Sequence, residues 1–198
     1  MKKKGKSYLL SRKITIRTFE NAIDGLNDFC KYIKTKIGTK IKILEIGCFA
    51  GDSSEIFALN FKSVYCVDVW ASGYDILDFC SDDKKFNMIE VENQFDEVAN
   101  YYKNIQKIKL KSDEAYKLFE DNFFDVIYFD SIHQYEPVKN DIINWNPKIK
   151  NMGFISGHDY NNIHFPGVKK AVDEMIIFPD EVFLDSSWIK RNENLLFK

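Results

Sequence analysis

The sequence of 198 residues lacks an apolar run near the roughly 18 residues that a membrane span needs. Its basic start, Lys2 to Lys4 with Lys6, is not followed by the apolar stretch of a signal peptide. Neither sign of charge dominates, because the formal net charge is only -2, and this argues against a nucleic acid partner. We therefore expect a cytoplasmic protein without membrane or nucleic acid partners.

Cysteine is also scarce, and its spacing argues against a disulfide-stabilised fold and against a structural zinc site. The four cysteines stand at positions 30, 48, 66 and 80 and form neither a C-x-x-C pair nor a zinc-ligand spacing. Cys48 and Cys66 lie in or beside apolar runs that favour strands. We expect reduced, mostly buried thiols rather than disulfides or a structural zinc site.

What the chain does contain is the composition of one ordinary globular domain. Hydrophobic residues make up 45% of the sequence and charged residues 29%, which is enough apolar material for a sizeable core. The length leaves little room for a second domain. We predict a flexible basic arm over residues 1–17 and a single domain over residues 18–198.

Short apolar runs alternate with amphipathic segments along that domain. Strands are predicted over 41–46, 64–67, 105–110, 124–129, 153–156, 181–184 and 188–190. Helices are predicted over 18–36, 53–60, 90–103, 112–120, 138–145 and 168–175. The alternation predicts an α/β fold: a Rossmann-like, seven-stranded, mostly parallel sheet with helices on both faces. No helix separates the last two strands, so they should form a C-terminal antiparallel hairpin.

The sharpest local motif is the turn after the first strand. The segment LEIGCFAGDSS (44–54) runs from a strand through Gly47 and Gly51 into a helix that Asp52 or Ser53 can cap. Asp68 ends the second strand, where a carboxylate can accept both ribose hydroxyl protons. The spacing differs from the G-x-G-x-x-G that holds a dinucleotide pyrophosphate. A ligand with a carboxylate and an amine fits this turn better.

With these motifs in order, the chain resembles class I S-adenosylmethionine-dependent methyltransferases. It is most similar to the group that holds the macrocin and mycinamicin sugar O-methyltransferases, with catechol O-methyltransferase as a more distant relative. The resemblance spans roughly residues 41–190 and is carried by LEIGCFAGDSS (44–54), VYCVDVW (64–70), FFDVIYFDSIHQYEPVKNDI (123–142), GFISGHDY (153–160) and PGVKKAVDE (166–174).

The resemblance implies S-adenosylmethionine as cofactor and assigns its contacts. Gly47 and Gly51 would flank the methionine half, Ser53 would hold its carboxylate, and Glu45 would support the loop or reach the amine through water. Asp68 would bind the ribose. The residues that it implies around the adenine are Ser112, Asp113 and Ile132.

Two acids end neighbouring predicted strands and should approach each other. Asp130 follows the fourth strand and Asp159 the fifth, and two close carboxylates need a cation or a shared proton. Oxygen ligands suit Mg²⁺ or Mn²⁺. In the resembled enzymes such acids bind a metal that holds the acceptor hydroxyl, and a base three residues after the first acid takes the proton. That base would be His133, so His133, Asp130 and Asp159 are the candidate catalytic residues.

One position departs from the resembled sugar enzymes. His158 stands where they place a second acid, so a metal held by Asp130, Asp159 and His158 would bind weakly, be a softer ion, or be absent. A hydrogen-bonded, purely structural histidine is the alternative at His158, and a loop histidine that orients Tyr135 is the alternative at His133.

The function predicted from the sequence is O-methylation of a small-molecule acceptor, a sugar or another polyol. A homodimer is compatible with the sequence, which does not fix the oligomeric state. Two other classes stay open on the residues alone. A nicotinamide-dependent oxidoreductase could use a similar sheet, although the glycine spacing and the terminal hairpin argue against it. A non-catalytic module could keep the cofactor fold, although Asp68, Asp130, His133 and Asp159 are all in place.

Overall fold

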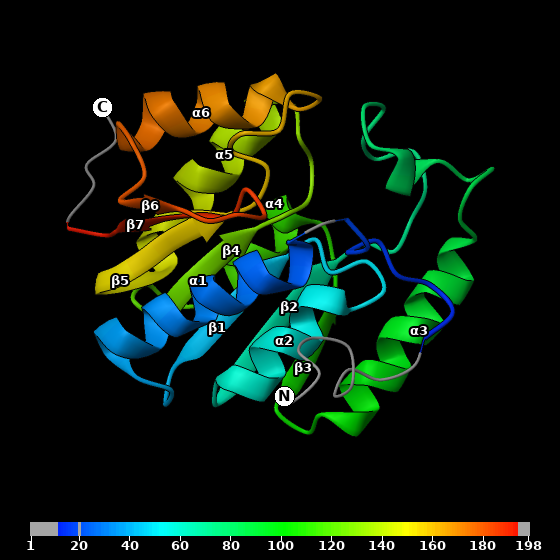
Figure 1. Cartoon of the computed structure of the whole chain (residues 1–198), viewed down its shortest axis with the longest axis horizontal. Helices are drawn as coiled ribbons and strands as arrows, with labels where there is room; N and C mark the ends of the chain where they lie inside the picture. Colours follow the sequence, from blue (N-terminus) through cyan, green and yellow to red (C-terminus); the bar gives the residue numbers. More distant parts are fainter. Residues whose placement is uncertain (1–11, 20, 194–198) are drawn as a thin grey trace.

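The computed structural model describes residues 12–19 and 21–193 of the chain. Its centre is a seven-stranded sheet in the order β3-β2-β1-β4-β5-β7-β6, with helices packed against both faces (Figure 1). The first five strands run parallel, and β7 pairs antiparallel with both β5 and β6. The strands are β1 (Lys42–Ile46), β2 (Ser63–Asp68), β3 (Ile105–Lys109), β4 (Phe124–Phe129), β5 (Ile149–Gly157), β6 (Glu181–Val182) and β7 (Trp188–Arg191).

Within the described residues, six α-helices cover the sheet, three on each face. Figure 1 shows α1, α2 and α3 on one side and α4, α5 and α6 on the other. The helices are α1 (Ala22–Ile37), α2 (Asp52–Asn60), α3 (Met88–Tyr101), α4 (Ser112–Ala115), α5 (Tyr135–Trp145) and α6 (Pro166–Ile176). Short 3-10 turns follow α4 and α5, and a third lies in the loop between β2 and α3.

Successive residues of the buried strands enter different halves of the core, because neighbouring side chains of a strand point to opposite faces. Ile43 of β1 joins the cluster under α1, α2 and α3, whereas Leu44 joins the cluster under α4, α5 and α6. In α1 the buried Leu26, Phe29 and Ile33 recur at three- and four-residue steps, which places one apolar stripe on the sheet.

The predicted fold class is confirmed, including the antiparallel pairing of the last two strands. Most boundaries shift by one to four residues, and three of the differences concern β5, α4 and β6. β5 starts at Ile149, before the predicted 153, and its pairing with β4 shifts register between Phe124 and Val126. The predicted helix 112–120 is one turn of α4 followed by a 3-10 turn, and β6 has only two residues.

The part of the predicted basic arm that the structure describes, residues 12–17, packs against the domain. Arg17 is buried, and the Arg12 side chain pairs with Asp52 and Glu55. Residues 12–17 are therefore not a flexible arm, because buried ion pairs hold them against the domain. The rest of the predicted arm, residues 1–11, lies outside the described residues.

Two expectations from composition can be compared with the structure. All four cysteines are free and buried. Among the described residues, none of the helices combines the length and the apolar character that a membrane crossing requires.

Candidate active site

The candidate site lies at the carboxyl ends of the parallel strands. There β1 sits between β2 and β4, so the strand order reverses, and open α/β sheets bind ligands at such a reversal. A cavity of about 230 Å³ occupies this edge. At one end it meets the turn between β1 and α2 and the residue Asp68; at the other end its lining includes Asp130, His133, His158 and Asp159.

The turn after β1 is held close to the end of β4. Gly47 has a φ of 87°, and its N–H donates to the Val67 carbonyl at 2.9 Å. A Cβ at this position would lie only 2.1 Å from the backbone oxygen of Asp130. Glycine is therefore required both for the left-handed conformation and for the close approach. Gly51 precedes α2 and faces Phe95 of α3, rather than a strand of the sheet.

Asp68 ends β2 and ties this turn together. Its carboxylate accepts hydrogen bonds from the backbone N–H groups of Cys48, Phe49 and Trp70, at 2.8, 2.9 and 2.8 Å. Burial raises the pKa of Asp68, and these N–H donors oppose that rise. The carboxylate also lines the cavity, so it can accept further donors from a ligand.

Glu45 lies beneath the turn rather than in the cavity. It is fully buried, and its carboxylate accepts hydrogen bonds from the hydroxyls of Ser53 and Ser54 at the start of α2. Burial raises the pKa of Glu45 to about 7, although both hydroxyl donors work against the rise. Ser53 itself lines the cavity, but its hydroxyl is directed to Glu45.

His133 is fixed between two carboxylates. Its Nδ1 lies 3.0 Å from Oδ2 of Asp75, which also accepts the His133 backbone N–H at 2.7 Å. Its Nε2 lies 3.0 Å from Oδ2 of Asp159, and its ring stacks on Phe165 with centroids 3.9 Å apart. Burial alone would lower the pKa of His133, but Asp159 and Asp75 raise it to about 10.

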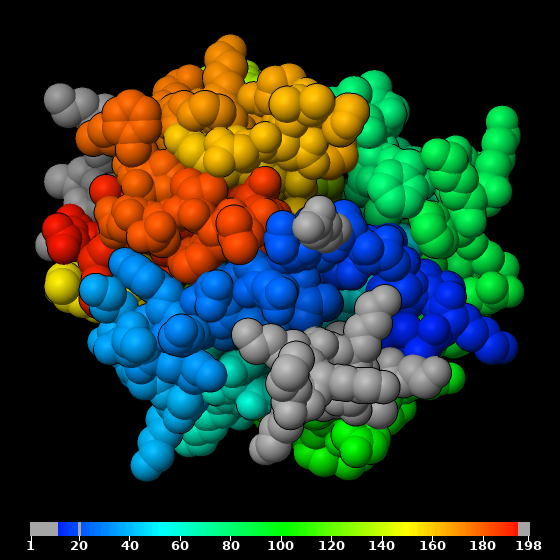
Figure 2. All heavy atoms as spheres, in the orientation of Figure 1, coloured from blue at the N-terminus to red at the C-terminus, as the bar shows by residue number. Residues whose placement is uncertain are grey.

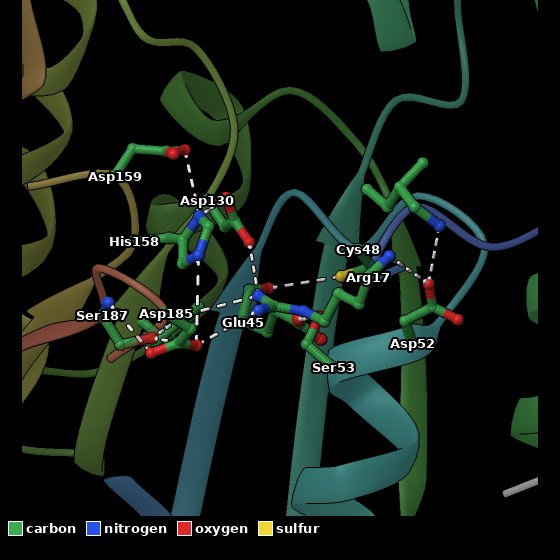
Figure 3. Close-up of polar contacts among 12 residues, drawn as sticks. Arg17, Glu45, Cys48, Asp52, Ser53, Asp130, His158, Asp159, Asp185 and Ser187 are labelled. Atoms are coloured by element: carbon green, nitrogen blue, oxygen red, sulfur yellow. Dashed lines mark hydrogen bonds and ion pairs between the residues drawn. The ribbon is translucent and has the colours of Figure 1, made fainter. Parts of the chain in front are cut away.

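A second group of charges surrounds Asp130. Figure 3 shows the guanidinium of Arg17 between Asp130 and Asp185, with His158 beside Asp130. Arg17 Nη2 lies 3.1 Å from Asp130 Oδ2, and Nη1 lies 3.3 Å from Asp185 Oδ2. His158 Nδ1 lies 3.1 Å from Asp159 Oδ2 and 3.6 Å from Asp130 Oδ1. Burial raises the pKa of Asp130, while the charges of His158 and Arg17 lower it.

Arg17 reaches this place because residues 12–19 cross the carboxyl edge of the sheet. Figure 2 shows this dark-blue segment on the surface between the green and the orange parts of the chain. Asp52, the first residue of α2, accepts the N–H groups of Ile16 and Arg17 at 2.9 and 3.2 Å and the Thr15 hydroxyl at 2.8 Å. The segment thereby forms part of the cavity wall through Ile16, Arg17 and Phe19.

The structure brings most of the predicted site residues to one cavity. Those that line it are Gly47, Ser53, Asp68, Asp130, His133, His158 and Asp159. Three predicted adenine contacts, Ser112, Asp113 and Ile132, do not line it. The Ser112 hydroxyl donates to Asp141 at 2.5 Å and accepts the Trp145 indole N–H at 2.8 Å, so packing against α5 explains its place.

The sequence did not predict the site contacts of four charged residues: Arg17, Asp52, Asp75 and Asp185, of which Asp52 was expected only as a helix cap. Arg17 falls in the predicted arm, and Asp75 falls in a loop without periodicity. In each of three contacts the two residues are 58 or more positions apart in the sequence: Asp75–His133, Arg17–Asp130 and Arg17–Asp185. The helix-start position of Asp52 was the only local signal.

Two clusters in the described part of the chain bring three ligand-type atoms within 4.8 Å of one another: Asp130, His133 and Asp159, and the fully buried Glu45, Cys48 and Cys66. The first cluster does not fit a hard divalent cation as arranged. Mg²⁺ prefers oxygen ligands, and both carboxylates here already face cationic partners. The Arg17 guanidinium, 3.1 Å from Asp130, keeps its charge at any pH that a protein tolerates and repels a second cation.

Comparison with known proteins agrees with this geometry. The family described as Methyltransferase domain matches residues 44–160, more than half of the chain. No functionally curated protein matches. Among the first matching solved structures, the chain spans between 49% and 82% of the other chain.

Three solved structures with TM-scores above 0.5 share the fold at low identity. The calicheamicin methyltransferase CalS11 has a TM-score of 0.66 at 13% identity, over 89% of this chain and 81% of its own. The O-methyltransferase NovP has 0.62 at 16%, over 85% and 78%. An O-methyltransferase from Bacillus cereus, solved with S-adenosylhomocysteine, has 0.55 at 13%, over 83% and 78%.

These matches decide against one of the function classes that the residues alone left open. The sheet order, the glycine turn and the family match speak together against a nicotinamide-dependent oxidoreductase. The chain belongs to the Methyltransferase domain family and is a class I S-adenosylmethionine-dependent methyltransferase.

Proposed function

We propose that this enzyme methylates a hydroxyl group of a small-molecule acceptor, a sugar or another polyol. One observation carries the proposal: a single cavity joins the glycine turn and Asp68 to His133 and Asp159. A cofactor at the first end and a hydroxyl at the second would meet in one shared space. The neighbours NovP and CalS11, an O-methyltransferase and a TDP-rhamnose 3'-O-methyltransferase, support an oxygen acceptor.

In this proposal the cofactor lies along the turn after β1. Gly47 and Gly51 flank its methionine half, the start of α2 at Ser53 holds its carboxylate, and Asp68 accepts its ribose hydroxyls. Glu45 supports the turn from below through the two serine hydroxyls. The adenine contacts proposed from the sequence are Ser112, Asp113 and Ile132.

The chemistry follows from the place of His133. The acceptor oxygen attacks the sulfonium methyl group, the carbon–sulfur bond breaks, and its electron pair leaves a neutral thioether in S-adenosylhomocysteine. The hydroxyl proton passes to Nε2 of His133, whose Nδ1 is held by Asp75. Positioning of the hydroxyl and exclusion of water supply most of the remaining acceleration.

The raised pKa of His133, about 10, means that the imidazole is protonated at neutral pH in this arrangement. A protonated imidazole cannot accept the hydroxyl proton. We propose that the acceptor hydroxyl takes the place of Asp159 at Nε2, which removes the carboxylate that raises this pKa most. Turnover then rises with pH, since the neutral imidazole is the active form.

The test is His133→Ala, with the exposed loop residue His164→Ala as matched control. S-adenosylhomocysteine release is measured with S-adenosylmethionine and a panel of nucleotide sugars that includes TDP-rhamnose. His133→Ala should lower kcat by about 10²- to 10⁴-fold, while its affinity for S-adenosylhomocysteine stays that of the wild type. His164→Ala should keep full activity.

Unchanged turnover in His133→Ala would remove this residue from the mechanism. A wild-type protein that binds S-adenosylhomocysteine but methylates no sugar in the panel would contradict the proposed acceptor class and leave the cofactor assignment standing.

A further inference from the structure

The buried Arg17 stands against Asp130, one of the two acids that would hold a metal ion at this end of the cavity. Its guanidinium bridges Asp130 Oδ2, at 3.1 Å, and Asp185 Oδ2, at 3.3 Å, and it lines the cavity. Asp130 is the acid that the sequence predicts as a metal ligand. A permanent cation therefore already stands against that acid, at the end of the cavity where the acceptor would lie.

The position of Arg17 is fixed from both of its ends. Its backbone N–H donates to Asp52 at 3.2 Å, next to the bonds from Ile16 and Thr15. At the far end, Asp185 is itself held, because it accepts the Ser187 hydroxyl at 2.8 Å and the Ser187 N–H at 3.2 Å. A side chain anchored in this way loses little freedom when the site is used, so it can act as a preorganised charge.

The other acid at this end also has its own partners within the chain. Oδ2 of Asp159 lies 3.0 Å from His133 Nε2 and 3.1 Å from His158 Nδ1. A divalent ion between Asp130 and Asp159 would have to displace these contacts and enter beside the guanidinium. Charge compensation here is thus supplied by the chain itself.

We propose that Arg17 is a positioning residue that takes the place of a divalent cation at the acceptor end of the site, so that this methyltransferase works without a metal. The proposal rests on the proposed function. Arg17 acts through Asp130: it fixes this carboxylate and places a permanent positive charge beside the acceptor oxygen. The planar guanidinium suits this bridging role because it can donate to two carboxylates at once.

The decisive measurement is Mn²⁺ binding to the full, chelator-treated chain, followed by the loss of the electron paramagnetic resonance signal of free Mn²⁺. The wild-type protein should show no stoichiometric Mn²⁺ site below about 1 mM. Stoichiometric binding at micromolar concentrations that Asp130→Asn abolishes would overturn the proposal. This measurement on the wild type needs no substitution of Arg17, so it tests the proposal even if variants at that position fail to fold.

Variants at position 17 sharpen the result. Arg17→Met removes the charge and keeps an unbranched side chain, so Asp130 and Asp159 become available and Mn²⁺ affinity should rise by at least about tenfold. Arg17→Lys keeps the charge and should bind no more Mn²⁺ than the wild type. If Arg17 had only a structural role, Mn²⁺ affinity would not rise in Arg17→Met, and Arg17→Met and Arg17→Lys would not differ in Mn²⁺ affinity.

Arg12→Met is the matched control, because Arg12 lies on the same segment and is equally buried, yet pairs with Asp52 and Glu55 instead of the acceptor acids. It should leave Mn²⁺ binding unchanged. A gain in both variants would show that loosening the segment, and not the charge of Arg17, opens the site.

Calorimetry with S-adenosylhomocysteine separates the two proposals. A wild type that binds S-adenosylhomocysteine and also an Asp130-dependent Mn²⁺ ion refutes the role of Arg17 alone. A wild type that does not bind S-adenosylhomocysteine refutes the proposed function, whatever its response to Mn²⁺.

Discussion

At the scale of single residues, the site depends on carboxylates whose burial is offset by different partners. Asp68 is held by three backbone N–H groups, whereas Glu45 has two serine hydroxyls and is fully buried. Hydroxyls are weaker than a cationic partner at stabilising a buried carboxylate. Glu45 therefore keeps its proton to a pH far above the ordinary range, with a pKa of about 7.

This shift makes the stability of the fold depend on pH. Between the ordinary value of 4.5 and about 7, the folded state holds a proton on Glu45 that the unfolded state has released. The contribution of Glu45 is thus fully present below pH 4.5 and is lost as the pH rises through 7. At 1.36 kcal/mol per unit, the loss is about 3 kcal/mol.

Glu45→Gln removes this titration. Urea unfolding at pH 5 and pH 8 should show that the wild type loses stability relative to Glu45→Gln by about 2.5 kcal/mol between the two values. The comparison of two proteins at each pH cancels the other titrating groups. A wild-type-to-variant difference that is equal at both pH values would contradict the raised pKa.

At the same scale, the sequence identified the acids and bases that follow strands, but not the partners that set their charge. Asp130, His133 and Asp159 could be found because strand ends are visible in the hydrophobic pattern. Asp75 could not, because its bond to His133 depends on how the loop between β2 and α3 folds back over the sheet. Such long-range loop contacts leave no periodic trace in one sequence.

At the scale of elements, the turn from β1 into α2 packs against the chain that follows β4, and so brings the two ends of the cavity together. Gly47 is the point of contact, since its backbone packs on the end of β4 at Asp130 and Ser131. Three non-glycine residues of this edge, Phe49, Trp70 and Asp159, also have a positive φ, and such backbone strain is often concentrated at functional sites. Hydrophobic patterns do not encode these conformations, so the sequence predicted the turn and not its strain.

Gly47→Ala should therefore be costly. The added Cβ meets the Asp130 carbonyl oxygen at 2.1 Å, so the turn or the end of β4 must move. We expect a loss of roughly 3 kcal/mol or more in urea unfolding, together with weakened binding of S-adenosylhomocysteine by calorimetry.

Gly73→Ala is the control, because Gly73 also has a positive φ, of 75°, but a Cβ there meets nothing within 4 Å. It should cost only about 1–2 kcal/mol from backbone strain. Equal losses in the two variants would show that the close approach at Gly47 has no energetic weight.

At the scale of the whole molecule, the parallel sheet and its two layers of helices could be predicted because the strands are continuous apolar runs. The path of residues 12–19 across the sheet edge could not. That segment is polar and basic, and its burial depends on Asp52, Asp130 and Asp185, which lie on three separate parts of the chain. The site thus combines a sheet and helices that the sequence predicts with a segment, residues 12–19, whose position it does not predict.

The cavity joins β1, β2, β4 and residues 12–19, so a ligand in it should stabilise the molecule as a unit. A ligand that binds only the folded state at 100 times its Kd adds about 2.7 kcal/mol. For a chain of this length, that corresponds to a rise in Tm of about 5–10 °C with S-adenosylhomocysteine.

Asp68→Asn should lose at least half of the rise, measured against its own unliganded Tm, because Asp68 both closes the turn and faces the ligand. Asp28→Asn, an exposed change on α1, should keep the full rise; an equal rise in all three proteins would place the cofactor elsewhere.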